Sequence, residues 1–84
     1  MAMSYEERMK VTLEILGRHV DIDRAILPTD SIQSDLGLDS LGVMELVADI
    51  EDRFEVQIPQ EVLSTISTVE DVVKALDKLP AAKS

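Results

Sequence analysis

Residues 35–54 read DLGLDSLGVMELVADIEDRF and contain a strong signal for the start of a helix. Asp39 is a good N-cap because its carboxylate can accept a hydrogen bond from a free N–H group of the first turn. From Ser40 onward, apolar residues recur at the i, i+4, i+7 and i+11 spacing of one helix face: Val43, Val47, Ile50 and Phe54. The stretch therefore predicts a helix over about 40–55, with Leu46 at the border of its core side.

The segment before this helix, about residues 21–38, is longer than most connections in a compact domain. Pro28 and Gly37 oppose helix formation within it. Apolar side chains nevertheless occur along it: Ile22, Ile26, Leu27, Ile32, Leu36 and Leu38. We therefore predict an ordered loop that packs on the helices and leads the chain to Asp39 and Ser40.

A first helix is predicted upstream of this loop. Ser4 followed by Glu7 is a capping-box pattern, and the helix that it opens should end near Gly17 or Val20. Its expected core stripe has the same spacing as the later helix: Met9, Leu13, Leu16 and Val20.

Two more helices are predicted toward the C-terminus. Pro59 suits the first turn of a short helix, which would hold Val62 and Leu63. Either of two capping pairs can open the last helix: Ser67 with Glu70, or Thr68 with Asp71. Its apolar residues are Val69, Val72, Val73, Leu76 and Leu79. Pro80 and the small polar tail after it should end the ordered structure.

These elements predict an all-α fold, a four-helix bundle of three longer helices and one short helix, with a long ordered loop between the first two. We expect one domain over residues 1–84, with an ordered core of about 4–79 and short flexible tails. A chain of 84 residues is too short for the large α/β enzyme folds.

Composition excludes several classes of function. The chain has 17 acidic and 8 basic residues, a net charge of −9 and no cysteine. Acidity opposes nucleic-acid binding, which needs concentrated Lys and Arg, and the lack of cysteine excludes disulfides and thiolate metal sites. An EF-hand beginning at Asp21 and Asp23 fails at its later ligand positions, so no metal site is predicted. No apolar run long enough to cross a membrane and no signal-peptide pattern is present, so a cytoplasmic protein is expected.

The charge is concentrated between residues 25 and 73, where eleven acidic residues meet one basic residue, Arg53. Such a block can steer a basic partner, or it can simply keep the surface solvated. On the helix over 40–55, Glu45, Asp49 and Asp52 lie opposite the core side, and three apolar residues lie among or beside them: Leu41, Met44 and Ala48. These apolar residues either cover the loop or form a docking surface for a partner, and we favour docking.

Ser40 has no apparatus for catalysis of its own. Residues 37–42 have the spacing G-x-x-S-x-G rather than that of a nucleophile elbow, and no strand precedes them. The only histidine, His19, is expected near the end of the first helix as a favourable C-terminal residue. An exposed hydroxyl at a helix N-terminus is instead well placed to carry a phosphate, because free N–H groups and the helix dipole favour an anion there.

The stretch 35–54 closely resembles the acyl carrier protein family, and the resemblance continues through VQIP at 56–59 and ISTVEDV at 66–72. It implies that Ser40 accepts 4′-phosphopantetheine from coenzyme A through a separate phosphopantetheinyl transferase. The thiol of the arm would then carry acyl groups as thioesters to enzymes of fatty-acid, polyketide or specialised lipid synthesis. The chain itself would be a monomeric carrier, not an enzyme. The alternative is an acidic helical interaction module that is never modified.

The resemblance also implies which residues meet partners. Asp39 and Leu41 flank the attachment site, and basic patches on the transferase and on acyl-handling enzymes would dock on one group of residues: Asp35, Asp39, Leu41, Met44, Glu45, Ala48, Glu51 and Asp52. Three residues depart from the common fatty-acid pattern and leave the pathway open: Gly42, Asp49 and Arg53.

The core composition suits the handling of an acyl cargo. Tyr5 and Phe54 are the only aromatic residues, so the interior is aliphatic and can part its helices more readily than one locked by large rings. We predict an acyl-chain pocket between the second helix and the loop or the third helix, lined by Val47, Leu63 and Ile66. The alternative is a plain aliphatic core without a cavity.

Overall fold

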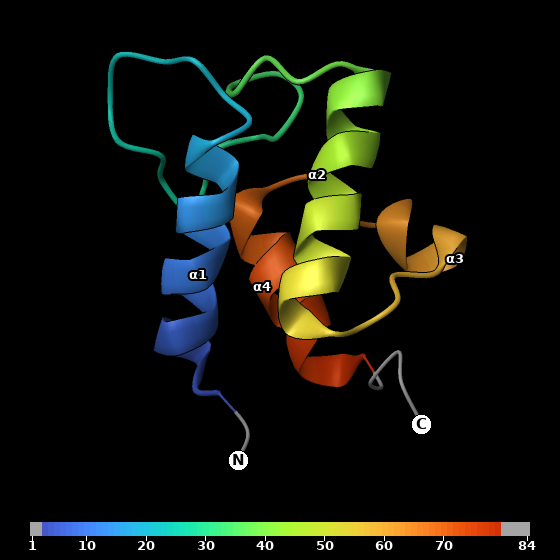
Figure 1. Ribbon diagram of the computed structural model, residues 1–84. Coiled ribbons are helices and arrows are strands. Elements are labelled where there is room, and N and C mark those ends of the chain that lie inside the picture. Colours follow the sequence, from blue (N-terminus) through green and yellow to red (C-terminus); the bar gives the residue numbers. More distant parts are fainter. Residues whose placement is uncertain (1–2, 80–84) are drawn as a thin grey trace.

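The computed structural model describes residues 3–79 and contains, in that range, four helices and no strand. They are α1 (Tyr5–Gly17), α2 (Ser40–Phe54), α3 (Gln60–Leu63) and α4 (Val69–Lys78) (Figure 1). The predicted all-α fold, with three longer helices and one short helix, is confirmed. The expected end of order at Pro80 lies outside the described residues. Within the described part, none of the helices has the length and apolar character needed to cross a bilayer.

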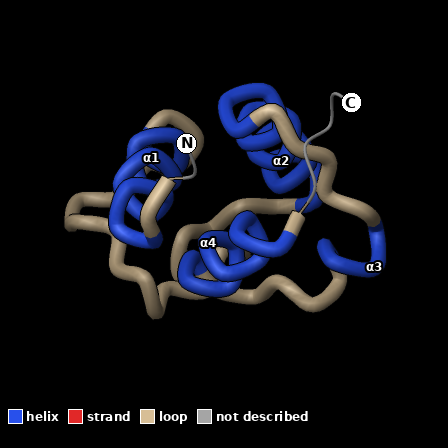
Figure 2. The backbone as a smooth tube through the Cα atoms, turned by 90° about the horizontal axis from the view of Figure 1, so that it is seen from below, coloured by secondary structure: helices blue, strands red, loops and turns tan. Residues whose placement is uncertain are grey.

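The helices α1, α2 and α4 surround the core, and α3 lies on the side of α2 and α4 that is away from α1 (Figures 1 and 2). The helix α1 packs against both α4 and α2. An ion pair between Arg8 Nη2 and Asp77 Oδ1, 3.0 Å apart, also joins α1 to α4. This arrangement leaves one side of α2 facing α3.

The starts of α1 and α4 follow from capping chemistry. Ser4 Oγ accepts from the Glu7 N–H at 3.1 Å, and Glu7 Oε1 accepts from the Ser4 N–H at 2.8 Å. The Ser4 N–H holds the pKa of the Glu7 carboxyl below its ordinary value. Thr68 and Asp71 form the corresponding capping box of α4, so the alternative pairing of Ser67 with Glu70 is wrong.

The core side of α1 differs from the predicted stripe. Thr12, Ile15 and Leu16 are fully buried, whereas the other predicted stripe residues are only half-buried: Met9, Leu13 and Val20. The predicted stripe contained only apolar residues and therefore left out the polar Thr12, which is 0% exposed. The helix α1 also ends at Gly17, so Val20 packs from the loop instead.

On α2 the centre of the buried side is Leu46 with Ile50, each 1% exposed. Val43, Val47 and Phe54 are half-buried. The prediction that placed Leu46 at the border of the core side is therefore wrong. The centre of the buried side is displaced from the predicted stripe by about one residue around the helix. The reason is that α2 packs against α1 on one flank, while Val43 and Val47 on the other line a cleft that residues of α3 also line, which widens its apolar side beyond a single stripe.

The connection over residues 18–39 is an ordered loop, as predicted. Its backbone binds the start of α4: the Ile32 N–H donates to Ser67 O at 2.9 Å, and the Glu70 N–H donates to Pro28 O at 2.8 Å. Ser31 and Thr68 form an isolated antiparallel bridge. Three of the predicted apolar anchors are buried: Ile32, Leu36 and Leu38. Leu27 is not an anchor, since half of its surface is exposed.

Asp30 is the buried charge that organises this loop. It is 6% exposed, and its carboxylate accepts two hydrogen bonds from Arg24, at 2.8 and 3.0 Å, and one from the Leu27 N–H at 2.8 Å. The Arg24 guanidinium holds the pKa of the Asp30 carboxyl below its ordinary value. A buried charge is tolerated when it is paired and hydrogen-bonded in this way.

We expect Asp30→Asn to lower the stability of the fold at neutral pH, because the pairing with Arg24 is lost. Because the pKa of Asp30 is lower in the folded protein than in the unfolded chain, the ionised carboxylate stabilises the fold fully above about pH 4. This stabilisation is lost as the pH falls below that value. The variant should therefore also lose less stability than the parent between about pH 4 and pH 2. Urea unfolding at a series of pH values measures both effects.

Asp23→Asn is the matched control, because it removes an equal charge from an exposed position of the same loop. Equal urea midpoints for the parent and Asp30→Asn at pH 7 would contradict the role given to Asp30.

Candidate functional site

Ser40 is the first residue of α2 and is exposed. The preceding residue, Asp39, is extended and caps the helix: its Oδ1 accepts from the Gly42 N–H at 2.8 Å, and its backbone oxygen accepts from the Val43 N–H at 2.9 Å. The N–H groups of Ser40 and Leu41 precede the first intrahelical donor and have no such partner. The predicted helix start is confirmed, and it places the Ser40 hydroxyl beside free backbone donors at the positive end of the helix dipole.

A turn over residues 31–37 lies just before Asp39 and the start of α2. Asp35 Oδ2 accepts from the Ser31 N–H at 2.7 Å, and Gly37 has a φ of +73°, a conformation that glycine adopts without strain. Asp35 itself is exposed. The two acids that precede Ser40, Asp35 and Asp39, are thus both fixed by backbone N–H groups.

Glycine at position 42 lowers the helix propensity of α2, but close packing at this position favours a residue without a side chain. A Cβ at this position would lie 3.1 Å from Leu38 Cδ2 and 3.2 Å from Asp39 Oδ1. A larger side chain would therefore crowd both a buried loop residue and the carboxylate that caps α2. Gly42, which departs from the common fatty-acid pattern, therefore allows the first turn of α2 to pack close to the loop.

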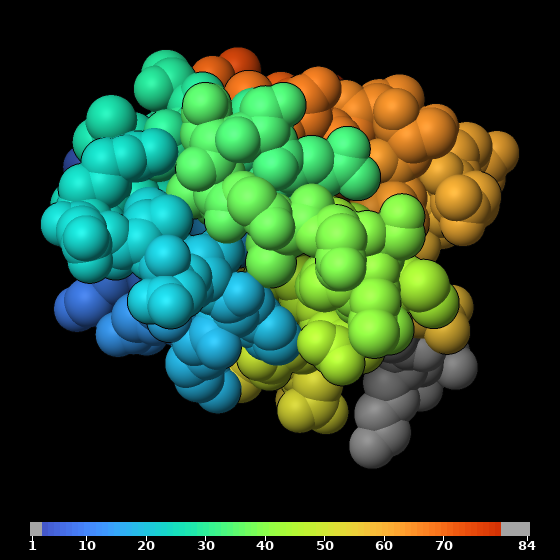
Figure 3. Space-filling model, turned by 90° about the horizontal axis from the view of Figure 1, so that it is seen from above, coloured from blue at the N-terminus to red at the C-terminus, as the bar shows by residue number. Residues whose placement is uncertain are grey.

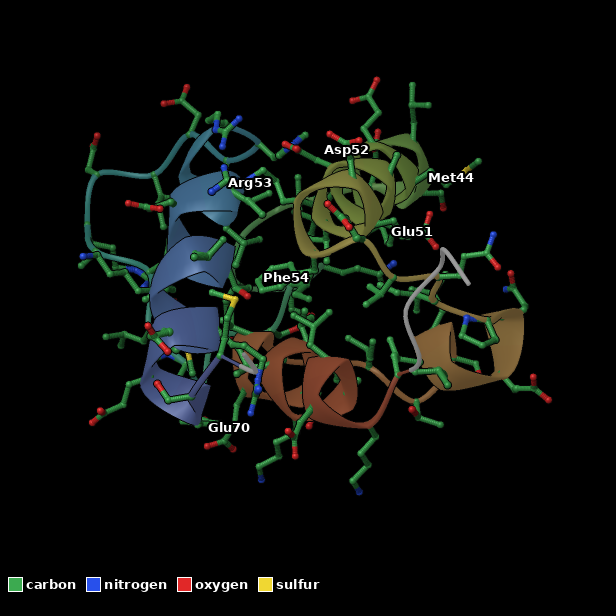
Figure 4. The ribbon with its side chains drawn as sticks, turned by 60° about the horizontal axis from the view of Figure 1, so that its bottom comes forward. Met44, Glu51, Asp52, Arg53, Phe54 and Glu70 are labelled. Carbon is green, nitrogen blue, oxygen red and sulfur yellow. The ribbon has the colours of Figure 1, made fainter. Side chains whose placement is uncertain are left out.

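The outer face of α2 carries exposed apolar residues among acids, as predicted. Leu41 is 63% exposed and Met44 is 65% exposed, and the neighbouring surface holds three more exposed residues: Glu45, Ala48 and Asp52. Figure 4 shows Met44 and Asp52 on the outside of α2, with Phe54 directed into the space between the helices. An apolar patch rimmed by carboxylates of this kind fits a partner with a basic rim.

Glu51 has a contact that the sequence did not predict. Its Oε2 accepts from the Ile58 N–H at 2.7 Å, and the residue is half-buried. The helix α2 ends just after it, where Glu55 adopts a left-handed conformation with φ of 54°. Glu51 therefore holds the segment that leads from α2 to α3, whereas Asp52 makes no such contact and is exposed.

Asp49 does not belong to the open acidic face on which it was predicted. Its Oδ2 lies 3.0 Å from His19 Nε2 and 3.9 Å from an Arg18 nitrogen, and it joins the end of α1 to the middle of α2. His19 lies beyond the end of α1, so it contacts Asp49 rather than acting as the predicted residue of the last helical turn. Asp49 follows Ser40 by nine residues, roughly 13 Å along the helix axis, which separates the His–Asp pair from the serine.

A cleft of about 610 Å³ lies beside Ser40, a volume typical of small-molecule sites. The three residues predicted for an acyl pocket, Val47, Leu63 and Ile66, all line it. The remaining lining residues are Ser31, Ile32, Gln33, Ser40, Val43, Met44, Leu46, Ile50, Ile58, Gln60, Ser64, Ser67 and Val72. Figure 3 looks down on this end of the molecule, with the start of α2 in light green and the α3 segment in orange.

Most of the polar lining residues were not predicted. Gln33 comes from the loop and Gln60 is the first residue of α3. Nothing in their local sequence marks them, because only the packing of the loop and α3 around α2 brings them to one cleft. The apolar residues of α2 that line the cleft were easier to find from the sequence. This helix has more apolar residues than one neighbouring helix can cover.

Comparison with known proteins identifies the family. Residues 10–76 match the family model described as "Phosphopantetheine attachment site". The chain is 37% identical to the acyl carrier protein of Prochlorococcus marinus (strain MIT 9515) over 76 residues, which cover 89% of this chain and 95% of that protein. The solved structure of the acyl carrier protein from Enterococcus faecalis superposes with a TM-score of 0.76 at 32% identity, covering 93% of this chain and 100% of that one.

We expect Glu51→Ala to destabilise the protein by about 1–2 kcal/mol, because the Ile58 N–H loses its acceptor in a partly buried position. Asp52→Ala is the matched control: it removes the same charge from the next residue, and as an exposed substitution it should change stability by less than about 0.5 kcal/mol. Chemical denaturation of the two variants measures the difference. Equal losses of stability would show that the bond to Ile58 contributes nothing.

Proposed function

The chain belongs to the acyl carrier protein family, and we propose that Ser40 is the residue that carries its 4′-phosphopantetheine group. The observation that supports this most directly is the place of the hydroxyl. It is exposed at the first residue of α2, beside the free N–H groups of Ser40 and Leu41, and it lines the mouth of the cleft. A phosphodiester attached there would meet backbone donors and the positive end of the helix dipole.

The residues around Ser40 fit an acceptor rather than a catalyst. The only histidine, His19, pairs with Asp49, far along α2 from the hydroxyl, so Ser40 has no histidine base beside it. The chain's own contribution is to present the hydroxyl and to keep the first turn rigid through Asp39. A transferase would supply the base and a magnesium ion. The attached group supplies the thiol that this cysteine-free chain lacks.

We expect the protein, incubated with coenzyme A and a broad-specificity phosphopantetheinyl transferase, to gain the mass of one phosphopantetheine. Intact mass spectrometry measures this. Ser40→Ala should gain nothing, and Ser34→Ala, which removes another exposed hydroxyl from the preceding turn, should be modified as the parent is. A folded parent that remains unmodified, or a Ser40→Ala variant that is modified, would contradict the assignment.

We also propose that the outer face of α2 docks the transferase and the acyl-handling enzymes. Leu41 and Met44 would supply apolar contacts, and the surrounding carboxylates would attract basic patches on the partners. The acids of this face are Asp35, Asp39, Glu45, Glu51 and Asp52. Among them Asp35, Asp39 and Glu51 also hold backbone N–H groups, so their charges are fixed in place before a partner arrives.

If this face docks the transferase, Met44→Ser should raise the KM of the transferase for the protein by roughly tenfold, equivalent to about 1.4 kcal/mol of contact energy. Kinetics of phosphopantetheine transfer measure this effect. Leu27→Ser is the matched control, because Leu27 is half exposed but lies in the loop. An unchanged KM in Met44→Ser, or an equal rise in Leu27→Ser, would contradict the docking face.

We further propose that the cleft holds the acyl chain. Its floor is aliphatic, its mouth includes Ser40, and Val47, Leu63 and Ile66 face it from three different segments. Each methylene buried there would contribute about 0.8 kcal/mol.

If the cleft holds the cargo, methyl NMR signals of Val47, Leu63 and Ile66 should shift progressively as the acyl chain on the holo-protein is lengthened. The methyl groups of Val73, which is fully buried but does not line the cleft, should change little. Signals at the three cleft residues that do not respond to chain length would place the cargo outside.

A further inference from the structure

Two of the residues that depart from the common fatty-acid pattern, Asp49 and Arg53, lie on the same side of α2. They are four residues apart and are therefore neighbours on one helix face. Asp49 contacts His19 and Arg18 at the end of α1, so this face of α2 is the one beside α1. Figure 4 shows Arg53 on the α1 side of α2 and Asp52 on the outside. This surface, the α1–α2 seam, consists of Arg18, His19, Asp49 and Arg53.

The α1–α2 seam is positively charged although the protein is strongly negative. The carboxylate of the seam, Asp49, has its Oδ2 3.0 Å from His19 Nε2 and 3.9 Å from Arg18 Nη1, and its side chain is only 25% exposed. Its charge is thus paired with α1. The Arg18 side chain is 56% exposed, and Arg53 is exposed as well. Two guanidinium groups beside one paired carboxylate give the seam a net positive charge.

Arg53 is the cation of this seam that lacks a partner. It is the only basic residue between residues 25 and 73, where eleven acids occur, and it forms no ion pair within residues 3–79. An acid four residues before a base is well placed for an ion pair along a helix, but the Asp49 carboxylate is directed to α1 instead. The Arg53 guanidinium therefore remains available to a carboxylate on another molecule.

The seam borders the outer face of α2, which we propose as the docking face. Asp52 directly precedes Arg53 and is exposed on that face, and successive residues are about 100° apart around a helix. A partner that covers Asp52 and extends toward α1 therefore passes from a negative surface to a positive one within about 10 Å, the diameter of a helix.

We propose that the α1–α2 seam selects enzymes whose basic docking patch ends in carboxylates on the side that meets α1. A carboxylate there can form a bidentate pair with an arginine. A patch that is basic throughout places like charges against Arg18 and Arg53, which disfavours the wrong partner. This inference rests on the proposed docking role of the outer face and specifies the class of enzyme that the face accepts.

Two synthetic helical peptides test the seam. They share a run of lysines and leucines, which is followed one turn later by two glutamates in the first peptide and by two glutamines in the second. The net charge of −9 taken alone predicts tighter binding of the glutamine peptide. The seam predicts the reverse order, with a Kd for the glutamate peptide that is lower by roughly threefold, the scale of one exposed ion pair. Isothermal titration calorimetry measures both Kd values.

A pair of variants tests whether Arg53 causes this order. In Arg53→Gln the glutamine peptide should become the tighter ligand, because the unpaired cation is gone. Lys78→Gln is the matched control: it makes the same change of charge at an exposed position of α4 and should keep the order of the parent. Tighter binding of the glutamine peptide to the parent, or an order that is unchanged in Arg53→Gln, would overturn the inference.

Met44→Ser separates this inference from the docking face on which it rests. Met44 is exposed and is nine residues from Arg53, so the two lie at opposite edges of the outer face. The variant should weaken the binding of both peptides by a similar factor. Binding that does not respond to Met44→Ser contradicts the docking face and the seam together. Binding that weakens in Met44→Ser but keeps its order in Arg53→Gln contradicts the seam alone.

Discussion

Hydrogen bonds from backbone N–H groups to carboxylates hold together the parts of this chain that are not helical. Asp30 fixes the loop through Leu27 and Arg24, Asp35 closes the turn before α2, and Glu51 fixes the segment after it. Charge-assisted bonds of this kind are stronger than neutral ones. Three of the five acids that we assign to partner binding, Asp35, Asp39 and Glu51, therefore also hold the backbone around the Ser40 hydroxyl and the end of α2.

The helix α2 contributes to the core, to the cleft and to the outer face, and some of its residues belong to two of these surfaces. Leu46 and Ile50 are buried in the core and also line the cleft with Val43 and Val47, and the exposed Met44 lies where the cleft meets the outer face. Because Ser40 is at the start of this helix, one helix links the proposed attachment point, the proposed cargo cleft and the proposed docking face. A partner that contacts the outer face touches the same helix that forms one wall of the cleft.

Features determined by neighbouring residues were predictable from the sequence, and features determined by packing were not. The Asp39 cap and the Ser4 box depend on residues three apart, so their chemistry is visible in the chain. The burial of Thr12 depends on how α1 packs, and a stripe of apolar residues alone does not include it.

Longer-range pairs also escaped sequence reasoning. His19 and Asp49 are separated by 30 residues, and no local pattern announces their contact. Val47, Leu63 and Ile66 line one cleft, whereas Gln33 and Gln60 join its lining only through the fold of the loop and α3. The family resemblance identified what the site carries, and the structure was needed to show which polar residues line the cleft.

The central claim is that the long loop is a fixed part of the fold and thereby sets where Ser40 stands. Amide hydrogen exchange tests it most directly, because the N–H groups of Ile32, Val69 and Glu70 all lie in the contacts between this loop and the start of α4. The account predicts that these three amides are protected to a degree similar to that of amides in the middle of α2. Exchange at the rate of an unstructured chain would contradict it and would leave Ser40 at the end of a free tether.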